Sequence, residues 1–219
     1  MTAPSMKLKV LVTTAAVLGL VVIWRMTQED PPLVDSLDTR MEKLRVTADV
    51  EALAQEAESP DIRTARRAVA TMGYVGPKAV KQIRRALTDR RPAVRRQATT
   101  AYARAAGPKE LAPLAEVARD DKSFRVRASA VTALGQARAC SEMETLLEAM
   151  NDEDLVVRRR AARAVTLILG RRYNYDPNSS SARRLKSIDV LRKFWAKAKD
   201  VVGEYHAQAR RRKKEAPGK

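Results

Sequence analysis

Arginine is the residue with which this sequence can do the most chemistry, because its guanidinium donates hydrogen bonds in a fixed fork that matches carboxylates and phosphates. Three arginines each follow an aspartate by six residues, in the pairs Asp89 and Arg95, Asp121 and Arg127, and Asp152 and Arg158. An aspartate in a turn can accept hydrogen bonds from a guanidinium and from amides at the next helix start. We expect these six residues to hold the structure together.

A second set of arginines is a candidate for anion binding. Arg66, Arg96 and Arg159 recur at one position of a repeated pattern, where Ala128 stands once instead, and Arg67, Arg160 and Arg163 lie close by. A solvated helix surface is the commoner role for such residues. If they bind an anion instead, the affinity should fall steeply with salt.

The C-terminal end holds a third basic group. Its members are Arg210, Arg211, Arg212, Lys213 and Lys214. This cluster could contact acidic lipid headgroups, a nucleic acid or an anionic cell-envelope polymer, or it could only keep the end soluble. The formal net charge is +17, and residues 176–219 alone carry 13 basic and 5 acidic side chains.

Other reactive side chains are scarce. The single cysteine, Cys140, excludes an intrachain disulfide, and the single histidine, His206, leaves metal or triad chemistry without ligands. We expect no catalytic residue, no metal and no cofactor. Cys140 lies near a predicted helix start, which can lower a thiol pKa, but a buried inert thiol is the favoured interpretation.

A repeat positions the arginines. Placing Ala68, Ala98, Ala130 and Ala161 in register gives steps of 30, 32 and 31 residues, an interval typical of solenoids. Each unit reads as two helices. The first helices are predicted near 48–58, 78–88, 109–119 and 142–150, and the second helices begin near Asp61, Pro92, Phe124 and Asp154. Gly73, Gly135 and Gly170 fall where second helices should end.

The repeated central alanines and the aspartate–arginine pairs resemble the HEAT-repeat family, in its short, alanine-rich, phycobilisome-lyase-type form. The resemblance covers about residues 47–170. The resemblance implies a right-handed all-α solenoid of about four helix pairs, in which the aspartates and arginines form a ladder between units. It also implies that the second helices line the concave face. The first unit departs from the pattern, with Ser59 and Ala65 at the ladder positions.

The N-terminus predicts a membrane segment within residues 1–28. Lys7 and Lys9 precede an apolar run at 10–24, and Arg25 follows it. The run also has the length of a signal-peptide core, but no small-residue cleavage site follows, so an uncleaved single-pass anchor is favoured. The positive-inside rule then places the repeats on the non-cytoplasmic side. Residues 29–46 are predicted to form a linker and a capping helix.

We assign the repeats to residues 47–175. A turn-rich connection is predicted at 171–181 and a long helix at 181–212. Residues 176–212 therefore form a loop and a helix that caps the end of the solenoid. The helix stripe consists of Leu185, Ile188, Leu191, Trp195, Ala198, Val202 and Tyr205. Residues 213–219 are predicted to form a basic, disordered tail.

We therefore expect a membrane-anchored, noncatalytic scaffold that binds an unidentified protein or an anionic polymer. One alternative is a nucleic-acid-binding module, which requires repeats that face the cytoplasm. The resemblance leaves a second alternative, an enzyme, since some relatives are bilin lyases and a HEAT-like class consists of DNA glycosylases.

Overall fold

The computed structural model describes residues 36–108 and 110–215, with side chains through residue 212. This part of the chain is helical and contains no strand, as the composition predicts. The repeats belong to one compact unit, which begins at Thr39. The predicted anchor at 10–24 lies outside the described residues and stays a prediction. Within the described ranges, no helix is both long and apolar enough to cross a bilayer.

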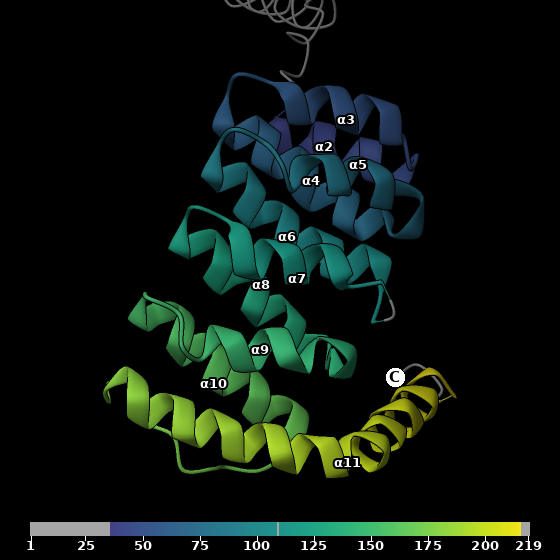
Figure 1. Ribbon diagram of the computed structural model, residues 1–219. Helices are drawn as coiled ribbons and strands as arrows, with labels where there is room; N and C mark the ends of the chain where they lie inside the picture. The colour runs from purple at the N-terminus through teal and green to yellow at the C-terminus, as the bar shows by residue number, and fades with distance from the viewer. Residues whose placement is uncertain (1–35, 109, 216–219) are drawn as a thin grey trace, which may run out of the picture. The chain divides into compact units, whose positions relative to one another are not determined.

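Four helix pairs follow one another, as the repeat predicts. They are α3 (Val50–Glu58) with α4 (Ile62–Val75), α5 (Val80–Ala86) with α6 (Pro92–Ala106), α7 (Ala112–Asp120) with α8 (Phe124–Gln136), and α9 (Met143–Ala149) with α10 (Leu155–Leu169). Short 3-10 turns, η1 (Pro77–Ala79) and η2 (Cys140–Glu142), precede α5 and α9. In each pair the first helix packs on the second, and α4, α6, α8 and α10 pack on one another in that order (Figure 1).

The aligned columns form the core. Ala68, Ala98, Ala130 and Ala161 are fully buried, and so are the first-helix anchors Leu53, Ile83, Leu114 and Leu146. Small side chains at the centre of each second helix let neighbouring helices approach closely, while leucine and isoleucine fill the space beneath. Before the pairs, α2 (Leu37–Val46) buries Met41, and Arg40 of α2 forms an ion pair with Glu56 of α3.

Helix ends follow the predicted signals. Gly76, Gly107 and Gly170 take positive φ at the ends of α4, α6 and α10. Gly73 and Gly135 lie close to the ends of their helices, as the sequence predicts, but they do not take the positive φ of a helix cap. They lie inside α4 and near the last turn of α8, where a Cβ would meet Ala101 at 2.9 Å and Ala164 at 2.5 Å. These glycines therefore permit close helix packing.

The last helix, α11 (Ser181–Glu215), packs on α9 and η2. Ile188 and Leu191 are buried as predicted, but the ends of the predicted stripe are wrong: Leu185 is 46% exposed and Tyr205 is 67% exposed. The stripe advances by about 3.3 residues per step and an α-helix has 3.6 residues per turn, so its ends drift off the buried face. His206 is buried in place of Tyr205 and contacts the Ile168 carbonyl at 2.7 Å.

The connection before α11 is fixed by its tyrosines. The Tyr173 hydroxyl donates to the Ala162 carbonyl at 2.5 Å, and the Tyr175 hydroxyl donates to the Met150 carbonyl. Burial raises the pKa of both hydroxyls, that of Tyr175 to about 12, so they stay protonated donors near neutral pH. The two tyrosines thus hold the segment against the last helix pair.

Candidate functional site

The ladder arginines connect successive repeats. Arg95 of α6 donates from Nε and an Nη atom to the Asp121 carboxylate of the next unit, at 2.7 and 2.9 Å, and its other Nη donates to the Asp89 carbonyl at 2.8 Å. Both side chains of the ion pair are largely buried. The expected six-residue pair therefore meets through the backbone carbonyl, and the carboxylate comes from the following unit.

Arg127 of α8 repeats this arrangement one unit later. It pairs with the Asp152 carboxylate at 2.9 and 3.0 Å and donates to the Asp121 carbonyl at 3.0 Å. The Arg127 side chain is 7% exposed and that of Asp152 is 11% exposed. The hydrogen bond to Asp152, which outweighs the opposing effect of burial, raises the pKa of Arg127, so its charge is permanent.

Arg158 is the last arginine of the ladder and has no following repeat. It donates to the Asp152 carbonyl at 2.9 Å, as the others do to their own units. Its Nε donates to the Pro177 carbonyl at 2.8 Å, in the connection before α11. That connection thus takes the place of a fifth unit.

The first interface uses an arginine that the sequence analysis did not select. Because Ala65 holds the ladder position of the first unit, Arg91 bridges the interface from the second unit. It donates to the Ser59 and Ala57 carbonyls at 2.5 and 3.0 Å and pairs with Asp89. Its guanidinium holds the pKa of the Asp89 carboxyl below the usual value. The sequence did contain a signal for this contact. Ala65 stands where the other units have their ladder arginine, so the interface between the first and second units needed an arginine from elsewhere.

The four second helices contain no acidic residue. Between them α4, α6, α8 and α10 carry twelve arginines and no lysine, and three of the twelve belong to the ladder. Eight of the others form no ion pair with any residue in the described ranges: Arg63, Arg66, Arg96, Arg104, Arg125, Arg159, Arg160 and Arg163. Arg66 is half-buried and the other seven are exposed.

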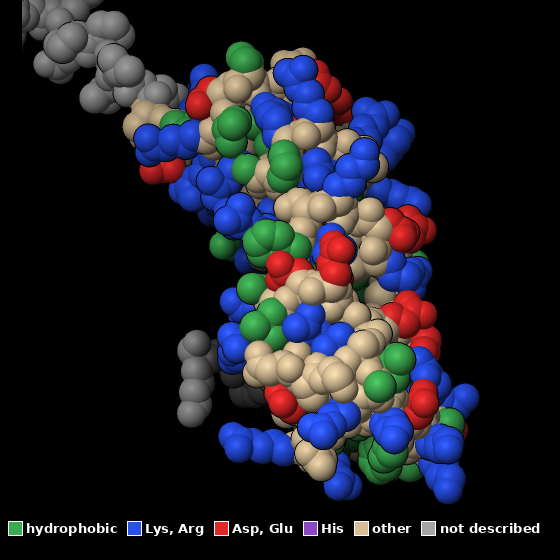
Figure 2. All heavy atoms as spheres, turned by 60° about the vertical axis from the view of Figure 1, so that its left-hand side comes forward, with side chains coloured by type: hydrophobic (Ala, Val, Ile, Leu, Met, Phe, Trp, Pro, Cys, Tyr) green, Lys and Arg blue, Asp and Glu red, His purple; other side chains and the backbone are tan. Residues whose placement is uncertain are grey.

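We call the exposed surface of these four helices the arginine face. It contains the predicted residues Arg66, Arg96, Arg159, Arg160 and Arg163, and it adds Arg63, Arg104 and Arg125, which the sequence analysis passed over. The missed signal was the absence of Asp and Glu from the four segments. On the face of the stack shown in Figure 2, basic side chains lie along its whole height and acidic ones form smaller groups.

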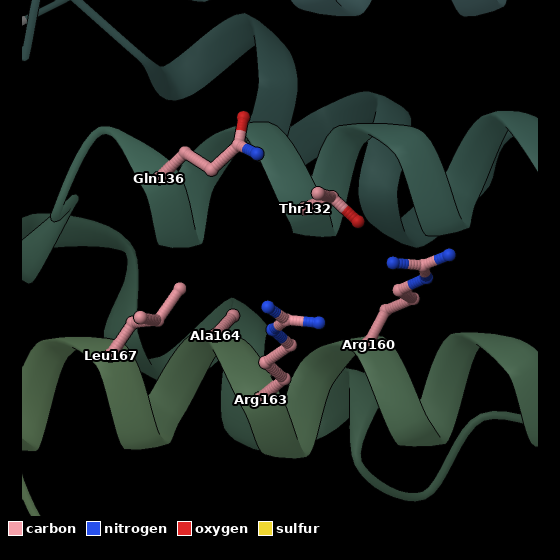
Figure 3. Close-up of a pocket in the computed structure, with 6 residues that line it drawn as sticks. All are labelled: Thr132, Gln136, Arg160, Arg163, Ala164 and Leu167. Atoms are coloured by element: carbon pink, nitrogen blue, oxygen red, sulfur yellow. The ribbon is translucent and has the colours of Figure 1, made fainter.

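Two hollows lie on the arginine face. One, of about 230 Å³, lies between α8 and α10. Figure 3 shows Arg160 and Arg163 rising from α10 toward Thr132 and Gln136 of α8. The other, of about 680 Å³, runs along α8 from Phe124 to Gln136 and is bounded by α6 and α10. The two hollows share Thr132, Gln136 and Arg160, and no carboxylate lines either of them.

The C-terminal basic cluster lies on a different element. Arg210, Arg211 and Arg212 are exposed on the last turns of α11, and the side chains of Lys213 and Lys214 lie outside the described residues. Arg210 reaches the neighbourhood of Cys140, where burial raises the thiol pKa against the lowering effect of Arg210 and Arg138. The inert thiol is thus the interpretation that the structure supports. Within the described ranges no three His, Cys, Asp or Glu side chains are grouped to hold a metal ion.

Comparison with known proteins shows what part of this chain is similar to. A model of HEAT repeats matches residues 50–135. Among solved structures, a chain of the complex of CpcE and CpcF of phycocyanin lyase from Nostoc sp. PCC7120 is similar at 22% identity and a TM-score of 0.49, over 64% of this chain and 88% of that one. No curated protein matches the sequence. The match to the family model and the stacked helix pairs agree: residues 50–135 form helical repeats that are similar to HEAT repeats.

Proposed function

We propose that this protein is a noncatalytic binding module whose arginine face holds an anionic macromolecule. The observation that carries the proposal is the complete absence of acidic residues from the four second helices, together with eight arginines that have no carboxylate partner among the described residues. On an ordinary solvated surface, acidic and basic residues are interspersed. A surface of one sign attracts ligands of the opposite sign and orients them.

The ladder arginines are excluded from this role by their contacts. Arg95 and Arg127 are largely buried and use their guanidinium groups on carboxylates and carbonyls of the fold. An incoming anion would have to displace those partners. The binding energy must therefore come from the exposed arginines of the face.

A charge-neutralised variant and a matched control test the proposal. Arg96→Gln, Arg159→Gln and Arg163→Gln together remove three charges from the arginine face. Lys81→Gln, Arg84→Gln and Arg85→Gln remove three charges from exposed positions of α5, a first helix. Binding of fluorescein-labelled poly-glutamate is followed by anisotropy.

We expect the arginine-face variant to bind poly-glutamate at least about tenfold more weakly than the unmodified protein, and the α5 variant to stay within about threefold of it. Affinity should also fall at least about tenfold between about 50 and 200 mM salt. Equal losses in the two variants would show that binding follows net charge alone and would contradict the proposal.

We also propose that residues 10–24 anchor the protein in a membrane as a single-pass segment, with the repeats on the non-cytoplasmic side. The proposal is supported by the charges that flank the apolar run. A reporter that is active only outside the cytoplasm should be active when fused after Lys219, and a reporter that is active only in the cytoplasm should be silent. The reverse pattern would place the arginine face in the cytoplasm and would favour a nucleic acid as its ligand.

A further inference from the structure

The arginine face has a gap at its third unit. The position held by Arg66, Arg96 and Arg159 in the other units is occupied in α8 by Ala128, which is 7% exposed. The neighbours Ser129 and Thr132 are also small. Because these residues project little, α8 forms the floor of the 680 Å³ groove, and α6 and α10 form its walls.

The groove combines apolar side chains with the small hydroxyl residues Ser129 and Thr132 inside, and it is basic at its rim. Phe124 and Ala128 of α8 and Val156 of α10 line it, and the Val156 side chain is 44% exposed. Arg96 and Arg160 stand on opposite walls, and neither forms an ion pair with a described residue. Exposed apolar surface enclosed by charges of one sign is typical of a recognition site.

The aromatic rings of the arginine face distinguish between classes of ligand. Single-stranded nucleic acids bind by stacking bases on open aromatic faces. The Phe124 ring carries the Arg125 guanidinium 5.1 Å from its centroid, and the Tyr74 ring carries that of Arg104 at 4.1 Å. One face of each ring is therefore occupied by an arginine, and the apolar surface that remains open in the groove is aliphatic apart from the Phe124 edge.

We propose that this groove binds an acidic segment of a partner protein, which inserts an apolar side chain over Ala128 between Phe124 and Val156. Carboxylates on either side of that side chain pair with Arg96 and Arg160 on the two walls. This inference rests on the proposed function, and it narrows the anionic ligand to a protein segment that combines charge with an apolar anchor. A polyanion without such an anchor would leave the groove unfilled.

Three probes test the inference on the purified full-length protein by fluorescence anisotropy. The first is a labelled peptide of glutamate and glycine with one central leucine, the second replaces that leucine with serine, and the third is single-stranded DNA of the same net charge. Burial of one leucine side chain should make the leucine peptide bind about 10- to 100-fold more tightly than the serine peptide. DNA should bind no more tightly than the serine peptide.

An alanine-to-arginine substitution separates the groove from the charge. Ala128→Arg completes the arginine column and adds a positive charge, but it fills the groove. It should abolish the preference for leucine while affinity for DNA stays equal or rises. Ala70→Arg, on α4 at the repeat position held by Arg163 in the fourth unit, adds the same charge outside the groove and should leave the preference intact.

Each other outcome has a defined meaning. If no probe binds, the proposed function itself is wrong. If the two peptides bind equally, the arginine face remains an anion site and the groove inference fails; DNA that binds at least tenfold more tightly than the leucine peptide also overturns it, in favour of a nucleic acid. If Ala128→Arg does not fold by circular dichroism, Val156→Ser at an exposed position gives the same test: it should weaken the leucine peptide about three- to tenfold and leave the serine peptide unchanged.

Discussion

Arg127→Met is expected to destabilise the repeats strongly. The substitution keeps an apolar stem but removes the guanidinium, which leaves the Asp152 carboxylate, 11% exposed, with the Asp154 amide at 2.7 Å as its remaining described donor. Removal of one partner from a buried ion pair costs about 3–5 kcal/mol. The bond to Glu153, whose side chain is 84% exposed, adds little to this figure.

The magnitude lies near the lower end of that range. Asp152 keeps some contact with solvent, so part of its charge is rehydrated, and about 3 kcal/mol is the expected loss. For a chain of this length, such a loss corresponds to a fall in Tm of about 6–12 °C. The measurement is urea unfolding followed by far-UV circular dichroism. The dependence of the unfolding free energy on urea concentration is compared between variants, because solenoids can unfold in steps and a changed dependence would reveal this.

Two controls sharpen the Arg127 experiment. Arg96→Met makes the same charge change at an exposed position without an ion pair, and should shift the free energy of unfolding by no more than about 0.5 kcal/mol. Arg127→Met combined with Asp152→Asn should cost less than the sum of the single changes, because the second change removes the unpaired charge. An Arg127→Met protein with an unchanged unfolding midpoint but lost peptide binding would refute the structural assignment of this arginine.

Two further predictions concern packing and acid. Gly135→Ala should destabilise the folded protein by about 1–3 kcal/mol, because the added Cβ would lie 2.5 Å from that of Ala164. Gly203→Ala, where the added Cβ meets nothing within 4 Å, should instead stabilise α11 by about 0.5–1 kcal/mol. The midpoints of urea unfolding compare the two variants, and equal effects would contradict the packing role of Gly135. Burial alone would raise the pKa of the Asp121 carboxyl, but hydrogen bonds from Arg95 and the Ser123 amide hold it below its usual value. Stability from this group should therefore be present above about pH 4 and disappear as the pH falls through the lowered pKa, so Asp121→Asn should flatten the acid dependence of the midpoint; an unchanged dependence would count against it.

The helix pairs could be predicted from the sequence because their signals are periodic. The four central alanines and the first-helix anchors lie in the core, where the register places them. The packing role of Gly73 and Gly135 could not be predicted, because a glycine near a helix end has the same appearance whether it caps the helix or admits a neighbour. The distinction depends on Ala101 and Ala164, which are distant in sequence.

The contacts of the candidate site were less accessible from the sequence. Column alignment brings Asp121 and Arg127 together within one unit, but the carboxylate that Arg127 contacts, Asp152, belongs to the next. Whether Arg127 contacts the carboxylate of Asp121 or that of Asp152 depends on the distance between successive repeats in the stack. The periodicity of the sequence does not give that distance. Arg91 lies outside every aligned column, so only the three-dimensional stack reveals that it bridges the first interface.

We expect the glycine pattern to make the stack stiffer at some helix interfaces than at others. Gly73 and Gly135 hold the same repeat position in α4 and α8, and Ala103 holds it in α6. Accordingly α4 packs closely on α6 and α8 on α10, whereas α6 packs less closely on α8, across the Thr99–Ser129 hydrogen bond of 2.7 Å. If the stack is bent, the α4–α6 pair and the α8–α10 pair should each move as a unit, and the bend should occur between α6 and α8. A partner bound along α8 would therefore bend the stack mainly at the α6–α8 interface. Its affinity would depend on how far that interface is already bent before the partner binds.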